Sequence, residues 1–375
     1  MVVQMSGVSP GKKYRWISLL KPRSGWSDEK IRAYSSIQGN SMNILKSVIY
    51  KREATVSFFL IGIFILVGIV NPDFLTLTSI DLISQNSILY IFLATGMTFV
   101  LLTGNIDVSV GGILGLCGAI IATLVRDGAN PIFSLLLVLL LGSLFGLING
   151  LGVAIAGIPS IIMTLGTLGI LRGMIVVYTG GKWVENLPDY FKNPSSQMLF
   201  DALNVYMLIT LLIIIPLQIY ISKSKRGRYF SAVGDNYNGA VLVGIPVKKI
   251  TILSFVLSGL FAALAGSVYA SQIGFIMNST GVGIEMIAIA SCVLGGVSLS
   301  GGIGSVAGAS LGAVIMTTIT SALVYLKVDA SWNNAISGML LITIVVSDVL
   351  IHRYTAERAK KIRLAAHVEN MEIGQ

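Results

Sequence analysis

Cysteine, histidine and charged residues are scarce in this chain. Its 375 residues include 2 cysteines, 2 histidines and 11% charged residues, against 54% hydrophobic residues. Because soluble domains carry about 25% charged residues, the composition excludes an ordinary soluble domain and indicates an integral membrane protein. Cys117 and Cys292 lie within apolar stretches, where cysteine packs as a small hydrophobic side chain. With so few Cys and His ligands, no metal site or cofactor is expected.

Motifs for enzyme chemistry are also missing. The chain has no Gly-x-x-x-x-Gly-Lys-Ser/Thr loop, so we expect no ATP site of that type. Nothing in the sequence resembles a Ser-His-Asp arrangement, and we predict no catalytic residues. The net charge of +9 lies in segments that flank apolar runs. This placement is typical of the positive-inside rule, so a nucleic-acid partner is not expected.

Long apolar runs dominate what remains. A helix needs about 20 apolar residues to cross a hydrocarbon core of ~30 Å, and runs of this length predict an all-α membrane protein, a polytopic helical bundle of about ten transmembrane spans. The predicted spans are 54–71, 80–103, 108–125, 132–156, 160–178, 204–222, 250–274, 284–300, 303–325 and 332–351. The spans around Asn105 and Leu299 are joined so tightly that discontinuous helices fit equally well there.

Basic residues set the predicted orientation. Residues 1–53 contain 10 Lys and Arg, the loop 222–249 contains 6, and the tail 352–375 contains 5. All three regions should therefore face the cytoplasm, around a transmembrane domain over 54–351. The first apolar run starts too late for a cleaved signal peptide, and the segment Thr179–Leu203 is expected on the opposite face.

The loop 222–249 has the signature of a short helix over 236–243. Asp235 is the expected N-cap, and Gly244 is the expected residue that ends the helix. The apolar or small residues at helical spacing are Tyr237, Ala240, Val241 and Gly244. So short a helix has little stability alone in water. We therefore hypothesise that another protein binds it. The small side chain of Ala240 is expected at that contact, where enlarging it would disturb the partner and not the bundle.

Polar residues within the spans are few, and such residues seldom face lipid. The residues expected to border a substrate route are Gln85, Asn86, Asn105, Asp107, Ser109, Thr164 and Glu285. Two alternatives remain open for them. Asp107 is also placed to cap the helix that follows it, and Arg172 and Glu285 either compensate each other or lie near an interface. Together these groups favour an uncharged polyhydroxy or amide-like cargo.

Several segments carry a family resemblance. They read GNIDVSVGG over 104–112, GIPSIIMTLGTLGILRG over 157–173, GRYFSAVGDN over 227–236, EMIAIA from Glu285, and GGVSLSGGIGS over 295–305. From about residue 75 to 350 the chain resembles the permease subunit of ribose/xylose/galactose-type sugar ABC importers, a binding-protein-dependent transport system inner membrane component.

The resemblance implies a membrane assembly and not an enzyme. It implies a multi-pass protein of the bacterial cytoplasmic (inner) membrane with both termini in the cytoplasm. Its partners would be ABC ATPase subunits, a periplasmic or lipid-anchored sugar-binding protein, a second permease protomer and membrane lipid. The residues it assigns to ATPase coupling are Gly234, Asn236, Tyr237, Ala240 and Gly244. Asn238 and Gly239 depart from the usual family pattern in this loop.

The expected function is import of a small neutral sugar by alternating access, with ATP hydrolysis on partner subunits. A nucleoside or a furanosyl signal molecule is the alternative cargo. A second hypothesis is an ion-coupled carrier that uses Asp107 and Glu285 as proton carriers, and a third is a membrane scaffold that transports nothing.

Overall fold

The computed structural model describes residues 52–196, 198–199 and 203–329, and positions 332, 335, 338, 339, 342, 343 and 346. Within the first three ranges the helices are α2 (Arg52–Val70), α3 (Leu77–Leu102), α4 (Val110–Arg126), α5 (Pro131–Ala154), α6 (Ser160–Thr179), α7 (Asp189–Ser196), α8 (Val205–Lys223), α9 (Arg228–Asp235), α10 (Tyr237–Leu242), α11 (Val247–Ile273), α12 (Ile284–Leu294) and α13 (Val306–Tyr325). A 3-10 turn, η2 (Pro72–Leu75), precedes α3, and two short strands, β1 (Met198–Leu199) and β2 (Leu203–Asn204), pair antiparallel. The predicted tails 1–53 and 352–375 lie outside the described residues, apart from the first two residues of α2.

Side-chain caps fix where several long helices begin. The Asn130 Oδ1 accepts hydrogen bonds from the N–H groups of Ile132 at 2.9 Å and Phe133 at 3.3 Å, ahead of α5. Thr76 caps α3 through Ser79, and Ser305 caps α13. These polar residues satisfy N–H groups that have no partner inside the helix, so each apolar run starts as a helix at a defined residue.

The predicted helix positions are largely confirmed, but the count of ten spans is not. Among the described residues, six helices are long and apolar enough to cross a membrane, namely α3, α5, α6, α8, α11 and α13. Helices α2, α4 and α12 contain shorter apolar stretches. The predicted tenth span, 332–351, lies largely outside the described residues.

The predicted span 284–300 is wrong in its second half. Helix α12 ends at Leu294, so its eleven residues reach only about 16 Å at 1.5 Å per residue. The chain then turns at Gly295 and Gly296 and doubles back, with the Ser298 N–H donating to the Ile303 carbonyl at 2.9 Å. This is the discontinuous geometry that the tight connection near Leu299 left open.

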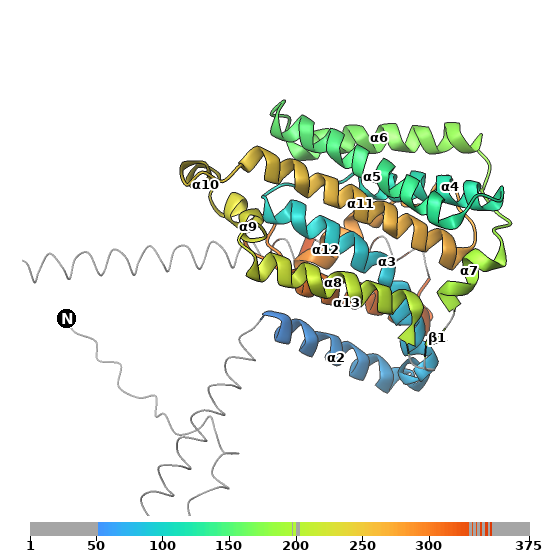
Figure 1. Ribbon diagram of the computed structural model, residues 1–375. Coiled ribbons are helices and arrows are strands. Elements are labelled where there is room, and N and C mark those ends of the chain that lie inside the picture. Colours follow the sequence, from blue (N-terminus) through green and yellow to red (C-terminus); the bar gives the residue numbers. More distant parts are fainter. Residues whose placement is uncertain are drawn as a thin grey trace, which may run out of the picture. The chain divides into compact units, whose positions relative to one another are not determined.

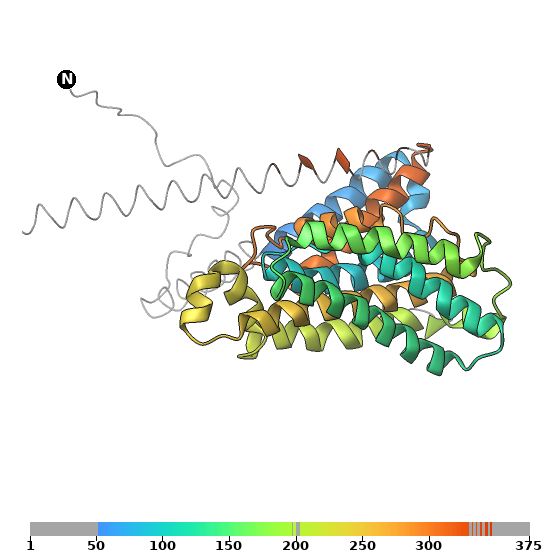
Figure 2. The same ribbon diagram turned by 90° about the horizontal axis from the view of Figure 1, so that it is seen from above.

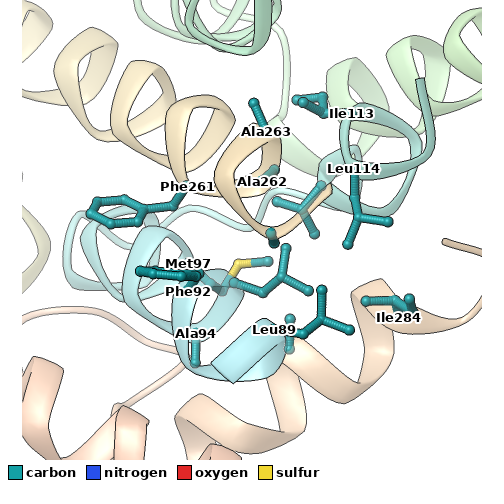
Figure 3. Close-up of a cluster of buried hydrophobic side chains, with 14 of the residues drawn as sticks. Leu89, Phe92, Ala94, Met97, Ile113, Leu114, Phe261, Ala262, Ala263 and Ile284 are labelled. Carbon is teal, nitrogen blue, oxygen red and sulfur yellow. The ribbon is translucent and has the colours of Figure 1, made fainter. Parts of the chain in front are cut away.

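Helices α3 and α11 run through the middle of the bundle, between α6 on one side and α2 on the other (Figure 1). Helix α11 packs against α5, α3 and α4. The buried apolar side chains gather where α3, α4, α11 and the start of α12 meet, and Figure 3 shows Phe92, Met97, Leu114 and Phe261 among them. Burial of apolar side chains from four helices makes this the main core.

Glycines let the central helices approach closely. A Cβ at Gly259 of α11 would overlap the Gly142 carbonyl oxygen of α5, and a Cβ at Gly266 would overlap the Leu114 carbonyl oxygen of α4. The α12–α13 pair repeats the pattern at Gly295 and Gly308. Small residues at helix crossings permit backbone contact in membrane bundles, so glycine sets the spacing of this core.

The bundle has two ends, which differ in their connections. The α9–α10 end carries the connections 103–109, 155–159, 224–246 and 295–305, and the α7 end carries 71–76, 127–130, 180–204, 274–283 and 326–329. Figures 1 and 2 both show α9 and α10 gathered at one end. The basic loop and the described residues of Thr179–Leu203 thus lie at opposite ends of the bundle.

Candidate functional site

Asp107 is at the centre of a buried polar cluster. Its carboxylate is 0% exposed, and Oδ1 accepts hydrogen bonds from the Ser109 N–H at 3.0 Å and the Ser109 hydroxyl at 2.6 Å. Oδ2 accepts from the Ser258 hydroxyl of α11 at 2.8 Å. Both oxygens are therefore satisfied within the chain, as a buried carboxylate requires.

The cluster continues through Ser109 into two more helices. The Asn149 amide of α5 donates to the Ser109 hydroxyl at 2.8 Å, and the Thr167 hydroxyl of α6 donates to Asn149 Oδ1 at 2.6 Å. We call Asp107, Ser109, Asn149, Thr167 and Ser258 the Asp107 cluster. It ties the start of α4 to α5, α6 and α11, four elements that the sequence separates widely.

Thr164 supports the same connection from its side. Its hydroxyl accepts a hydrogen bond from the Val108 N–H at 3.1 Å and donates to the Ser160 carbonyl at 2.8 Å. The Ser160 hydroxyl in turn accepts from the Ile106 N–H at 3.2 Å. Helix α6 thereby holds the connection 103–109 in place. Of the predicted route residues, the structure brings Asp107, Ser109 and Thr164 together.

The other predicted route residues lie elsewhere. The Gln85 side-chain amide donates to the Asp81 carboxylate at 2.7 Å, and the Gln85 backbone carbonyl accepts a hydrogen bond from the Gln272 side chain at 2.9 Å. Asn86 is exposed. Asn105 lies at the α9–α10 end beside Thr103. The seven positions therefore occupy separate places and do not meet at a single site.

Glu285 lies in the first turn of α12, next to α4. Its side chain is 8% exposed, and Oε1 accepts from the Gly283 N–H at 3.3 Å. Oε2 has no hydrogen-bond partner in the described structure and packs against Gly111 of α4. Arg172 of α6 donates instead to the Thr280 carbonyl at 2.7 Å. Ion pairs between described residues join Arg126 to Asp127 and Asp189 to Lys192, and Arg172 and Glu285, which are both described, form no direct pair with each other.

The predicted coupling loop contains two helices where the sequence indicated one. We call residues 224–246, which contain α9 and α10, the α9–α10 segment. Phe230 of α9 packs edge-on against Phe99 of α3, with ring centroids 5.1 Å apart. Gly234 of α9 lies against the Leu102 carbonyl of α3. Gly234 therefore contacts this chain's own bundle.

The cap of α10 is one residue later than predicted. Asp235 ends α9, and Asn236 caps α10 by accepting a hydrogen bond from the Gly239 N–H at 2.8 Å. Both are good N-cap residues, but only Asn236 has the extended backbone that a cap needs. Gly244 follows α10 with φ +79°, a conformation that glycine adopts without strain.

The expectation that enlarging Ala240 would leave the bundle undisturbed is wrong. Ala240 is 4% exposed and is part of the main apolar core. The residues that α10 leaves exposed are Tyr237, Val241, Leu242 and, just after it, Val243. With Ile245 and Pro246, several of them line an open groove. An apolar surface of this kind is typical of a protein contact. It keeps Tyr237 and Val241 of the predicted stripe, but Leu242 and Val243 are exposed where Ala240 is buried.

Comparisons with known proteins agree on one family. A family model described as "Branched-chain amino acid transport system / permease component" matches residues 79–345. The autoinducer 2 import system permease protein LsrC of Yersinia pseudotuberculosis serotype O:3 (strain YPIII) is 43% identical over 305 residues, 81% of this chain and 87% of the relative. LsrC of Escherichia coli O9:H4 (strain HS) shows the same identity over 305 residues, 81% of this chain and 89% of the relative. No solved structure matches. By the extent of both matches, the chain belongs to the family of permease subunits of ABC importers.

Proposed function

We propose that this permease carries a furanosyl signal molecule of the autoinducer-2 type. The observation that carries the proposal is the 43% identity to autoinducer-2 permeases over 81% of this chain. As a multi-pass inner-membrane subunit of an ABC importer it is a transport component, not an enzyme, and it works with ATPase and binding-protein subunits. A small neutral sugar, which the sequence favoured first, is the second candidate cargo.

The polar groups of the bundle interior do not select a cargo by themselves. The groups that Asp107 contacts are hydroxyls and a backbone N–H, and the next groups outward are an amide and a further hydroxyl. These groups are bonded to one another, so they support the helices around a route and are not offered to a cargo. The chemistry does not by itself distinguish a furanosyl signal from a pentose, so the choice between them depends on the relatives.

The route proposal assigns different roles to the predicted residues. Asp107, Ser109 and Thr164 hold the helices that border the route, because their polar atoms are engaged within the chain. Asn105 and Glu285 are proposed to contact cargo, one at each side of the Asp107 cluster. Gln85 and Asn86 of α3 are proposed to lie at the outer rim, and a second permease protomer completes the route.

The α9–α10 segment is proposed to couple this permease to its ATPase. The exposed apolar residues of α10 lie beside the cations Lys248 and Lys249 in one groove. Asn236 is both the C-cap of α9 and the N-cap of α10. Because the two helices are joined at this residue, an ATPase that binds in the groove and moves α10 would move α9 as well. The six basic residues of 222–249 support a cytoplasmic position for this end under the positive-inside rule, which is the side where ATP is available.

Replacing Leu242 with aspartate tests the coupling surface. Leu242 is 87% exposed, so the change leaves the bundle folded but puts a charge into an apolar contact. We expect a loss of binding-protein-stimulated ATP hydrolysis of at least about tenfold, since burying an unpaired charge costs several kcal/mol. Leu77→Asp is the matched control, because Leu77 is 85% exposed at the opposite end of the bundle. Normal stimulation in Leu242→Asp, with the ATPase still bound, would exclude α10 as the coupling element.

Uptake by the reconstituted importer tests the cargo. The permease, its ATPase and its binding protein are expressed together in a strain that lacks its own importers for autoinducer-2, ribose and galactose. We expect accumulation of labelled autoinducer-2, little accumulation of ribose or galactose, and loss of uptake when ATP is depleted. Efficient ribose uptake without autoinducer-2 uptake would replace the proposed cargo with the neutral sugar. Uptake that survives ATP depletion and stops with a protonophore would favour the ion-coupled mechanism.

A further inference from the structure

A polar cavity lies between the α9–α10 segment and the bundle. It has a volume of about 470 Å³, within the range of small-molecule sites. Its walls come from the ends of α3 and α5 and the start of α11 on one side, and from α9 and Tyr237 on the other. The polar residues that line it are Thr103, Asn105, Tyr237, Lys248, Thr251 and Ser300.

One hydroxyl at the edge of this cavity is available to a ligand. Thr251 is 5% exposed as a residue and lines the cavity, and its hydroxyl makes no hydrogen bond to the described residues. A hydroxyl in this position can bond to a molecule that fills the cavity. The Asn105 amide nitrogen is bonded to Thr103, and the Asn105 side-chain oxygen accepts no hydrogen bond from the described residues. The cavity thus has two lining residues with an unused polar atom, Thr251 and Asn105.

The charge in the cavity has one sign. Lys248 is its lining cation, and no carboxylate lines it. Helix α11 begins at Val247 without a side-chain cap, so the N-terminal end of a long helix adds partial positive charge at the same place. Hydroxyls and an amide supply the remaining lining polar groups. This set matches a ligand with one anionic group and several hydroxyls.

We propose that this cavity binds a small hydroxylated anion of the size and chemistry of a pentose phosphate. The anionic group lies against Lys248 and the start of α11, and the ligand hydroxyls bond to Thr251 and Asn105. Binding depends only on this chain. Its consequence rests on the proposed coupling function: a ligand that bonds to Tyr237 and to α11 together would hold α10 against the bundle and slow the ATPase cycle.

Titration calorimetry on the purified permease in nanodiscs, without ATPase, tests the binding. The probes are ribose 5-phosphate, free ribose and inorganic phosphate. We expect ribose 5-phosphate to bind more tightly than either of the others. Lys248→Gln should weaken its binding roughly tenfold or more, and Thr251→Val roughly fivefold, as expected for loss of a charged and a neutral hydrogen bond. Lys249→Gln is the matched control, since Lys249 is the adjacent cation and lies outside the cavity lining.

Three results would overturn the proposal. If free ribose binds as tightly as ribose 5-phosphate, both in wild type and in Lys248→Gln, the cavity is a site for neutral cargo. If inorganic phosphate binds as tightly as ribose 5-phosphate, and Thr251→Val has no effect, the cavity is a surface that binds any anion. No binding of ribose 5-phosphate at millimolar concentration, in protein whose thermal unfolding is normal, would exclude the site.

The regulatory consequence has its own measurement. With the ATPase and binding protein present, ribose 5-phosphate on the cytoplasmic side, at a concentration near its wild-type Kd, should lower stimulated ATP hydrolysis more in wild type than in Thr251→Val, because Thr251 lines the cavity and lies outside the groove in which the ATPase is proposed to bind. Unchanged hydrolysis at saturation would refute the regulatory role. Failure of the proposed transport function is distinguishable, because hydrolysis would then not respond to the binding protein even without ribose 5-phosphate.

Discussion

Replacing Asp107 with alanine should destabilise the bundle. The change removes the acceptor of three hydrogen bonds, from the Ser109 N–H, the Ser109 hydroxyl and the Ser258 hydroxyl. The site is fully buried, so water cannot replace the carboxylate, and each stranded donor costs about 1–3 kcal/mol. Serine hydroxyls can rotate to other acceptors, so we expect the lower end of the sum, about 3 kcal/mol in the free energy of unfolding.

Asparagine at position 107 separates the structural role from a direct role in transport. Asp107→Asn keeps Oδ1 as the acceptor for Ser109 and puts an amide where Oδ2 accepted from Ser258, whose hydroxyl is able to accept in turn. We expect a loss of about 1 kcal/mol, similar to that of Ser258→Ala, and near-normal uptake per folded molecule. The carboxylate then acts by positioning α4, α5, α6 and α11.

The assay pairs stability with transport. Unfolding is followed by denaturant titration of the purified permease in detergent, and uptake is normalised to the amount of folded protein in the membrane. Wild-type stability in Asp107→Ala would refute the hydrogen-bond reasoning. Abolished uptake in Asp107→Asn at wild-type stability would show that the charge itself takes part in transport, as the proton-carrier hypothesis requires.

Two further predictions concern packing and orientation. Gly259→Ala should destabilise the bundle by about 1–3 kcal/mol, because the new methyl group overlaps the Gly142 carbonyl oxygen. In Gly169→Ala the new methyl group meets no atom within 4 Å, so this variant should be neutral or stabilised by up to about 1 kcal/mol. Equal losses of stability at both positions would contradict this packing. Lys225→Cys should react with an impermeant thiol reagent only from the cytoplasm and Asp127→Cys only from outside, because both positions are exposed at opposite ends and the two native cysteines are buried. Labelling of Lys225→Cys from outside would invert the proposed orientation.

Helix positions could be predicted from the sequence because apolar length carries that information. The predicted start of 132–156 lies one residue from the start of α5, where Asn130 and Pro131 give a clear N-terminal signal. The end of α12 was harder to place. The run 284–300 is apolar enough to extend further, and only the pairing of Ser298 with Ile303 shows that the chain turns back at Gly295.

The candidate site was less predictable, because its contacts are tertiary. The Asp107–Ser258 hydrogen bond joins residues 151 positions apart, and a serine inside an apolar run gives no sign of its partner. Ala240 shows the same limit on a smaller scale. Its place in a helical stripe was right, but which side of a short helix faces its own bundle depends on where that helix docks. Helix α9 was missed, although Phe230 and Val233, three residues apart and both buried, carry its amphipathic signal.

The contacts at the α9–α10 end give the coupling proposal a mechanical basis. Gly234 of α9 lies between the Leu102 carbonyl of α3 and the backbone of Gly301 and Gly302, and the Gly302 N–H donates to the Leu102 carbonyl at 3.0 Å. These are contacts between backbone atoms, so no flexible side chain absorbs a displacement of α9. The connection that follows Leu102 leads within five residues to Asp107, which is bonded to α4 and α11 and through them to α5 and α6. A partner that pulls on α10 would therefore act on the helices that border the proposed route through α9 and one short, tightly held connection.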